Sequence, residues 1–244
     1  MVHLSTGYRS QRATVHSSLI AVSVLLIGPS SIGKSSILDP FVIIGYPIRT
    51  KMQRIMAQDQ RTESLEELFD QVSTGATIGS KNHIRAFTTV YEDSCLEDGV
   101  ETGTNVTIRE DCYIGANSII GSGSILDSGV HIGDNARIQS STFIPPKVRL
   151  GRNVFLGPAV RFANDKYPVS SRLIDTEVED GVIIGMGALI MAGITIGQNA
   201  VVAAGSIVTK NVPEAQVVMG APARLLMTRE EYDQKQEEYK SLGD

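Results

Sequence analysis

A repeat of six residues runs through the middle of this chain and constrains its fold more than any other feature. Counting every sixth residue from 78 to 162 gives fifteen positions, and all but Thr102 carry a large apolar side chain. Four residues after each of the first fourteen comes a second series, in which all but Asn82 are small or β-branched. The same frame occurs at residues 32–44 and returns, in a shifted register, at 178–208.

A period of six fits neither the 3.6-residue turn of a helix nor the two-residue alternation of an ordinary strand. It predicts a parallel β-helix built from hexapeptide repeats. Three six-residue rungs make one triangular coil, with large side chains stacked inside and small residues relieving the corners. Twenty-four rungs fit this frame, so we expect an all-β fold of about eight coils, spaced about 4.8 Å apart.

Two breaks in the register divide the chain. We expect an N-terminal arm at 1–18, a β-helix domain at 19–214 with excursions at 46–76 and 163–177, and a C-terminal capping segment with a helix at 215–244. Ser64 and Glu67 form a capping box that predicts a helix at about 62–72. A second box, Thr228 with Glu231, predicts a terminal helix that closes the open end of the coil.

Composition and charge exclude several classes of protein. The chain has 22 basic and 27 acidic residues, which argues against a general nucleic-acid binder. Two cysteines cannot form a disulfide framework, so we expect a reducing, cytoplasmic location. The apolar run Leu19–Ile27 is too short to span a bilayer, and no signal-peptidase site follows it. We therefore expect this run to be the first buried strand, and no membrane partner.

Residues Gly28–Ser35 match the pattern of a phosphate-binding loop, G-x-x-x-x-G-K-[ST]. Such a loop must open a helix whose N-terminus holds the phosphate. Here Pro40 follows closely, and the segment leading to Ile44 is strand-like. Ile32 also fits the six-residue frame, so we expect two rungs of the coil here and no nucleotide hydrolysis.

The stretches Val201–Pro213 and Gly220–Arg224 resemble the C-terminal part of the hexapeptide-repeat acyltransferases. Within that family, Ile132–Gln139 and Val154–Pro168 resemble the nucleotide-sugar N-acetyltransferases, and the likeness covers about residues 77–225. The resemblance implies a left-handed β-helix and a homotrimer with acetyl-CoA bound between subunits. It implies acetyl transfer to the amine of a nucleotide-linked amino sugar, as in cell-surface glycan biosynthesis.

The same resemblance suggests the site residues. Gly185, Ala203, Ala204 and Gly205 would let the pantetheine arm lie close to the coil, although the packing of corners also favours small residues. We expect Lys210 and Arg224 to bind the phosphates of the cofactor; for Arg224, a salt bridge to the acidic terminal helix is the alternative. The resemblance also implies that the nucleotide sugar contacts Arg109, Gln139 and Lys166.

The acceptor site is expected where the register breaks. Asn164 and Asp165 lie at that break and match an Asn-Asp pair of the family, so we expect Asp165 to take or relay a proton and Asn164 to hold the amine. An ordinary Asx turn is the alternative. His131 is a further catalytic candidate, with a solvated surface histidine as the alternative. Related chains often carry His where this one has Thr104.

No metal site is expected. His83 and His131 are 48 residues apart, which is eight rungs, so they lie on different faces of the coil and cannot share a zinc ion within one subunit. A β-helix carbonic anhydrase is therefore disfavoured. Two alternatives to the N-acetyltransferase stay open: an O-acetyltransferase acting on a sugar or small alcohol, and a trimeric β-helix scaffold without activity.

Overall fold

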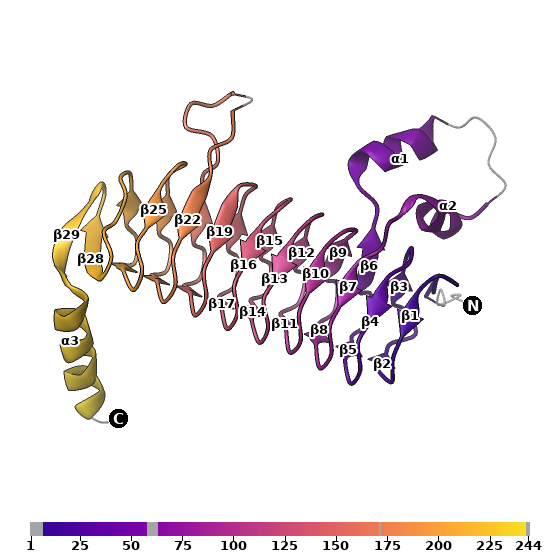
Figure 1. Cartoon of the computed structure of the whole chain (residues 1–244), viewed down its shortest axis with the longest axis horizontal. Helices are drawn as coiled ribbons and strands as arrows, with labels where there is room; N and C mark the ends of the chain where they lie inside the picture. The colour runs from indigo at the N-terminus through magenta and orange to yellow at the C-terminus, as the bar shows by residue number, and fades with distance from the viewer. Residues whose placement is uncertain (1–6, 58–62, 171, 243–244) are drawn as a thin grey trace, which may run out of the picture.

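In the computed structural model, which describes residues 7–57, 63–170 and 172–242, the chain winds into one β-helix whose coils follow one another along its length (Figure 1). The strands form three sheets in which neighbours are parallel and three places apart in the chain, except at the C-terminal end, where the last two strands are added to one sheet and pair antiparallel with each other. The hexapeptide-repeat β-helix is thus confirmed.

Each sheet forms one side of the coil. Sheet I contains β1 (Thr14–Val15), β4 (Ser31–Ile32), β7 (Thr77–Ile78), β10 (Cys95–Leu96), β13 (Tyr113–Ile114), β16 (His131–Ile132), β19 (Val148–Leu150), β22 (Thr176–Val178) and β25 (Thr195–Ile196). Sheet II contains β2 (Leu19–Ile20), β5 (Ile37–Leu38), β8 (His83–Ile84), β11 (Glu101–Thr102), β14 (Ile119–Ile120), β17 (Arg137–Ile138), β20 (Phe155–Leu156), β23 (Ile183–Ile184), β26 (Val201–Val202), β28 (Gln216–Gly220) and β29 (Ala223–Thr228). Sheet III contains β3 (Leu25–Leu26), β6 (Ile43–Tyr46), β9 (Thr89–Tyr91), β12 (Thr107–Ile108), β15 (Ile125–Leu126), β18 (Phe143–Ile144), β21 (Arg161–Phe162), β24 (Leu189–Ile190) and β27 (Ile207–Val208).

The repeat positions fill the inside of the coil. Strand registers such as Leu96↔Ile114 and Ile108↔Leu126 bring the six-residue series into columns, and one continuous buried core results. The exception, Thr102, is also buried. Its hydroxyl accepts a hydrogen bond from the Arg85 backbone N–H at 3.0 Å. The polar group is therefore satisfied inside an otherwise apolar column.

The coil is longer than predicted. The strands β1–β27 make nine coils of three strands, where the sequence indicated about eight. The added coil is the first one. Ile20 and Leu26 continue the six-residue frame of Ile32 backwards, and only the five-residue step from Val15 to Ile20 breaks it. The interpretation of Leu19–Ile27 as one buried strand was wrong. It forms two rungs on two sheets, and Leu19 is largely exposed.

Two of the three edges of the coil bear on function. We call the edge where the chain turns from sheet II to sheet III the II–III edge, and the edge where it turns from sheet III to sheet I the III–I edge. Both excursions leave the coil at the III–I edge, after β6 and after β21, and project from the same side of the molecule (Figure 1).

The first excursion contains two helices, α1 (Arg49–Met56) and α2 (Leu65–Val72). The capping box of Ser64 and Glu67 is confirmed, and α2 begins at Leu65; residues 58–62 lie outside the described part. Helix α1 was not predicted. Apolar side chains from both helices cover part of the outer surface of sheet III in the first two coils and form a second core of Ile27, Ile55, Leu68 and Phe69.

The C-terminal end is closed differently from our expectation. Strand β28 continues sheet II and buries Val217 and Val218, and β29 folds back on it antiparallel. Helix α3 (Arg229–Ser241) starts at the expected capping box on Thr228 but has no buried residue in its described length, and it projects from the end of the coil (Figure 1). The hairpin, rather than the helix, covers the core.

Residues 28–35 are part of the coil wall. They run from the turn after β3 through β4 toward β5, so the element that follows Lys34 is a strand rather than a helix. A phosphate-binding loop needs a helix N-terminus at this point. The expectation that this segment forms rungs of the coil is therefore confirmed.

Candidate functional site

The small residues expected to accommodate the pantetheine arm stack along the II–III edge. Gly185 follows β23, and Ala203, Ala204 and Gly205 make the corresponding turn one coil later, after β26. A Cβ at Gly185 would collide with the backbone of Ala203 and Ala204. Corner packing therefore accounts for Gly185. Gly205 has a φ of +68°, and a Cβ there would meet nothing within 4 Å. Glycine is therefore favoured at this position by the backbone conformation rather than by a lack of space.

Two cations meet at the C-terminal end of the coil. Lys210, in the turn after β27, and Arg224, in β29, line one hollow of about 420 Å³ whose walls include Val212, Val218 and Leu225. Both side chains are exposed. The Arg224 guanidinium donates to the Ala223 carbonyl at 3.0 Å and, within the described residues, pairs with no acid of α3. The alternative of a salt bridge to that helix was wrong.

Asn164 and Asp165 begin the second excursion, at the III–I edge after β21. The Asp165 carboxylate accepts hydrogen bonds from the N–H groups of Tyr167 (2.9 Å) and Ser170 (2.7 Å) and from the Ser170 hydroxyl (2.8 Å). The bonds from Ser170 hold the pKa of Asp165 below its usual value. All three contacts lie within the loop, which is the arrangement of an Asx-type turn.

His131 is partly buried on the outer face of sheet I. Its ring stacks on Tyr113, with centroids 4.7 Å apart and planes 9° from parallel. Burial, with a contribution from Arg149, lowers the pKa of the imidazole below its usual value. Tyr113, His131 and Arg149 are each 18 residues apart, which is one full coil, and they follow one another on this face. Sequence reasoning missed Tyr113, although the spacing of 18 was a usable signal.

The three residues expected to contact the nucleotide sugar lie apart. Arg109 is held at the III–I edge by two bonds to Glu110 (2.8 and 2.9 Å), lies 3.4 Å from Asp127, and covers the Tyr91 ring. Gln139 is on the II–III edge, where its backbone carbonyl accepts from the hydroxyls of neighbouring turns. Lys166 is exposed in the second excursion.

The predicted residues therefore form two groups rather than one. Asn164, Asp165 and Lys166 lie on the III–I edge, whereas Gly185 and Ala203–Gly205 lie on the II–III edge, and sheet III separates the two. Lys210 is also on the III–I edge, two coils beyond Asn164. Arg109 lies on that edge three coils before Asn164, roughly 14 Å away at the usual strand spacing.

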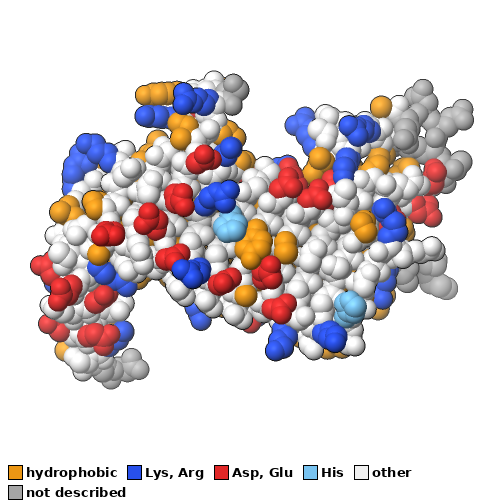
Figure 2. Space-filling view, in the orientation of Figure 1, with side chains coloured by type: hydrophobic (Ala, Val, Ile, Leu, Met, Phe, Trp, Pro, Cys, Tyr) orange, Lys and Arg blue, Asp and Glu red, His pale blue; other side chains and the backbone are white. Residues whose placement is uncertain are grey.

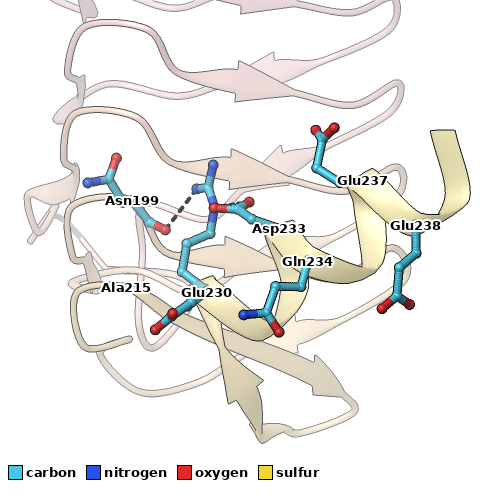
Figure 3. A pocket seen from close by; sticks show the side chains of 8 residues that line it. Asn199, Ala215, Glu230, Asp233, Gln234, Glu237 and Glu238 are labelled. Carbon is cyan, nitrogen blue, oxygen red and sulfur yellow. Dashed lines mark hydrogen bonds and ion pairs between the residues drawn. The ribbon is translucent and has the colours of Figure 1, made fainter. Parts of the chain in front are cut away.

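A hollow beside the terminal helix is not a candidate donor site. It measures about 940 Å³ and lies between α3 and the end of the coil (Figure 3). Its rim carries the carboxylates of Glu230, Asp233, Glu237 and Glu238, and acidic side chains gather over this helix (Figure 2). Its one arginine, Arg229, bonds to Asp233 at 2.7 Å and to the Asn199 carbonyl at 3.0 Å. This surface would repel the phosphates of coenzyme A.

Within residues 7–57, 63–170 and 172–242, no group of three or more His, Cys, Asp or Glu side chains is placed to hold a metal ion. None of the helices in the same ranges has the length and apolar character needed to cross a bilayer.

Comparison with known proteins identifies the repeat. The family model for the bacterial transferase hexapeptide (six repeats) matches residues 93–128 and 175–210. No curated protein matches the chain. Among solved structures, a hexapeptide-repeat acetyltransferase from Vibrio cholerae O1 biovar eltor, complexed with acetyl coenzyme A, is 31% identical over 45% of this chain and 69% of its own, with a TM-score of 0.30.

Two further solved structures match the chain at lower identity. PerB from Caulobacter crescentus, in complex with CoA and GDP-perosamine, is 19% identical over 62% of this chain and 84% of its own, with a TM-score of 0.36. The acetyltransferase domain of PglB from Neisseria gonorrhoeae is 17% identical over 57% of each chain, with a TM-score of 0.44. The matched repeats show that the coil is built from hexapeptide repeats of the bacterial transferase type.

Proposed function

We propose that this protein transfers an acetyl group from acetyl-CoA to the amine of a nucleotide-linked amino sugar. The observation that carries the donor half is the hollow shared by Lys210 and Arg224, two exposed cations at one end of the coil. Coenzyme A is an anion through its phosphates, and a planar guanidinium beside an ammonium suits such groups. The acceptor half rests on the likeness of 132–139 and 154–168 to the nucleotide-sugar N-acetyltransferases.

We further propose that the site is completed by a second copy of the chain. The small residues of the II–III edge and the acceptor loop at Asn164 border opposite sides of sheet III, and a six-residue rung spans roughly 15–20 Å. Catalysis needs reacting atoms about 3–3.5 Å apart. If sheet II of one subunit packs on sheet I of the next, the II–III edge of the first adjoins the III–I edge of the second. Three such contacts close a ring, which gives the homotrimer.

The chemistry requires one proton acceptor. The neutral amine attacks the thioester carbonyl; a C–N bond forms, the C–S bond breaks, and the thiolate of coenzyme A leaves. The amine must lose a proton, which a base within hydrogen-bond reach can take. The lowered pKa and three accepted hydrogen bonds make Asp165 a poor proton acceptor, whereas burial lowers the pKa of His131 and so favours its neutral form, which can accept a proton. We therefore assign proton uptake to His131, loop positioning to Asp165, and orientation of the amine to Asn164.

The proposal is tested by thiol release from acetyl-CoA. The panel pairs amino-sugar nucleotides with the corresponding sugars that carry only hydroxyl groups. Release with the amines alone supports N-acetylation. Release with the hydroxyl compounds alone would instead indicate an O-acetyltransferase, and no release with either, from a folded protein, would indicate a scaffold.

The donor half has its own test. Removing Lys210 or Arg224 takes away one cation each, so Lys210→Ala and Arg224→Ala should raise KM for acetyl-CoA roughly tenfold, the loss of one charge-assisted contact. Lys34→Ala, an exposed lysine in the second coil, is the matched control and should leave KM unchanged. Equal KM values in all four proteins would overturn the assignment of this hollow.

A further inference from the structure

Two phenylalanines occupy strained positions on the II–III edge. The third residue of the turn has a positive φ in every coil from the second to the ninth. Six of these positions hold small residues, namely Asn105, Gly123, Ser141, Ala159, Gly187 and Gly205. The other two are Phe41 (φ +64°) and Phe87 (φ +63°), and a bulky side chain is disfavoured in this conformation. Both rings are more than half exposed, and they stack with centroids 5.1 Å apart.

Phe41 forms one wall of a hollow over the first two coils. The hollow measures about 480 Å³, within the range of small-molecule sites. Its floor is the outer face of sheet III at Leu25 and Ile43, and Tyr8 supplies a second aromatic ring. Glu66, in the first turn of α2, lies at its rim. The stack on Phe87 holds the Phe41 ring in place as a wall of the hollow. The two unfavourable backbone conformations therefore contribute to the same surface.

Acidic side chains lie beside the hollow. Burial, and then the nearby charges of Asp70, Glu67 and Glu66, raise the pKa of the Tyr8 hydroxyl, against an opposing effect of Arg12. Asp70 is engaged by Arg12 and by the Gly28 N–H. Glu67 caps the helix. Glu66, by contrast, makes no hydrogen bond or ion pair with any described residue, so its carboxylate is available to a ligand.

We propose that this hollow binds an organic ammonium ion carried on an apolar body. Aromatic faces attract cations through their quadrupole, the carboxylate of Glu66 supplies the counter-charge, and Leu25 and Ile43 receive the apolar part. Phosphates and carboxylates are repelled by the same groups. The site lies in coils one and two, whereas the proposed acetyl-CoA site lies in coils eight and nine, roughly 34 Å away along the stack. It is therefore distinct from the proposed function and does not depend on it.

Calorimetric titration with three probes of one shape tests the proposal. Phenethylammonium carries the charge, 2-phenylethanol replaces it with a hydroxyl, and 3-phenylpropanoate reverses it. The ammonium ion should bind at least about fivefold more tightly than the alcohol, the scale of an exposed cation–π contact with a counter-charge. The carboxylate should not bind.

Two variants connect that binding to the residues. Glu66→Gln keeps the size of the side chain and removes its charge, and Phe41→Leu removes the ring and keeps an apolar wall. Each variant should bind the ammonium ion at least about fivefold more weakly than the parent protein and should bind the alcohol with nearly the same affinity. Glu101→Gln, an exposed carboxylate on sheet II, is the matched control. Glu66→Gln alone carries the test if Phe41→Leu misfolds. Equal affinity for the three probes, or ammonium binding that both variants preserve, would overturn the site.

Discussion

At the scale of single residues, the two candidate proton acceptors differ in what their surroundings do to the proton. Both pKa values are lowered, yet the consequences are opposite. For Asp165 the shift further favours the ionised form of a carboxylate that accepts three hydrogen bonds within its own loop. For His131 it removes the proton from an imidazole that would otherwise be partly charged near neutrality. A lowered pKa therefore makes Asp165 a weaker base, whereas it keeps His131 unprotonated and able to accept a proton.

The pH dependence of turnover should follow His131. A base must be unprotonated, so kcat/KM should rise as pH increases through the pKa of this histidine and level off above it. Because that pKa lies below the ordinary 6.5, the rise should be centred below pH 6.5. His131→Gln should remove this inflection and lower turnover roughly 10²-fold, the usual scale for a general base. Tyr113→Leu removes the stacked ring and should move the inflection upward; an unchanged profile in His131→Gln contradicts the assignment.

Asp165 should behave as a positioning residue. Asp165→Asn loses acceptor capacity toward Ser170 and loosens the loop, so KM for the acceptor should rise several-fold while kcat changes less. Ser170→Ala removes one of the same bonds and should shift KM in the same direction by a smaller factor. Since the pKa of Asp165 is lowered, these bonds persist above its ordinary 3.8 and are lost as pH falls through the lower folded value. A 10²-fold loss of kcat at constant KM would instead make Asp165 catalytic.

At the scale of elements, one buried carboxylate holds the first excursion. Glu92, fully buried, accepts hydrogen bonds from the backbone N–H groups of Ile48 (3.0 Å) and Thr74 (2.7 Å), which lie at the two ends of the excursion. It also bonds the Lys51 ammonium at 2.7 Å. Burial by itself would raise the pKa of Glu92, but the bonds from Lys51, Ile48 and Thr74 outweigh it and lower the pKa.

Glu92→Gln should therefore destabilise the fold. The amide keeps the volume but leaves Lys51, itself mostly buried, without its counter-charge, at a cost of about 2–4 kcal/mol. Denaturant unfolding followed by circular dichroism measures this, with Glu101→Gln on the surface as control. In the parent protein the contribution of Glu92 is present above pH 4.5 and is lost as pH falls through its lower folded pKa. A variant as stable as the parent at pH 7 would show that the excursion is held elsewhere.

Most of the coil could be predicted from the sequence, and the reason is geometric. The inward columns impose a period of six that no other fold shares, so Ile78 to Phe162 defined the rungs without further information. Strand β1 lies outside that frame because Val15 is five residues before Ile20, and α1 was missed because Arg49–Met56 lacks a capping side chain. The role of Glu92 was invisible, since its partners come from residues 44 and 18 positions away in the chain.

The candidate site was less predictable than the coil. The register break correctly located the loop at Asn164, but the hydrogen bonds of Asp165 depend on how that loop turns back on itself. The pairing of Lys210 with Arg224 in one hollow depends on β29 folding back on β28, which no period encodes. Counting rungs from the sequence does show that the site residues lie on two edges, because each rung ends at one particular edge of the coil.

The phosphate-loop match should be inert. Lys34 lies in an exposed turn between sheets I and II, where its backbone carbonyl accepts from the Lys81 N–H and no helix N-terminus is present. Lys34→Ala should leave the melting temperature and thiol release unchanged, and neither protein should release phosphate from ATP. ATP hydrolysis that depends on Lys34 would reverse this interpretation.

At the scale of the whole molecule, the proposed composite site makes activity depend on assembly. Static light scattering at micromolar concentration should give close to three times the chain mass of 26.3 kDa. Two variants then separate a shared site from a site within one chain. Asn164→Ala damages the III–I edge, and Ala204→Tyr obstructs the II–III edge at an exposed position. Each should be nearly inactive by itself.

Mixing the two variants under conditions that exchange subunits should restore activity. In a mixed ring, the intact II–III edge of an Asn164→Ala chain adjoins the intact III–I edge of an Ala204→Tyr chain, so one site per mixed trimer is whole. A random equal mixture should then recover roughly a quarter of the parent turnover, since a quarter of adjacent ordered pairs combine the two intact edges. If each site lay within one chain, every site would carry a lesion and no activity would return, and a monomer in solution would exclude the shared site altogether.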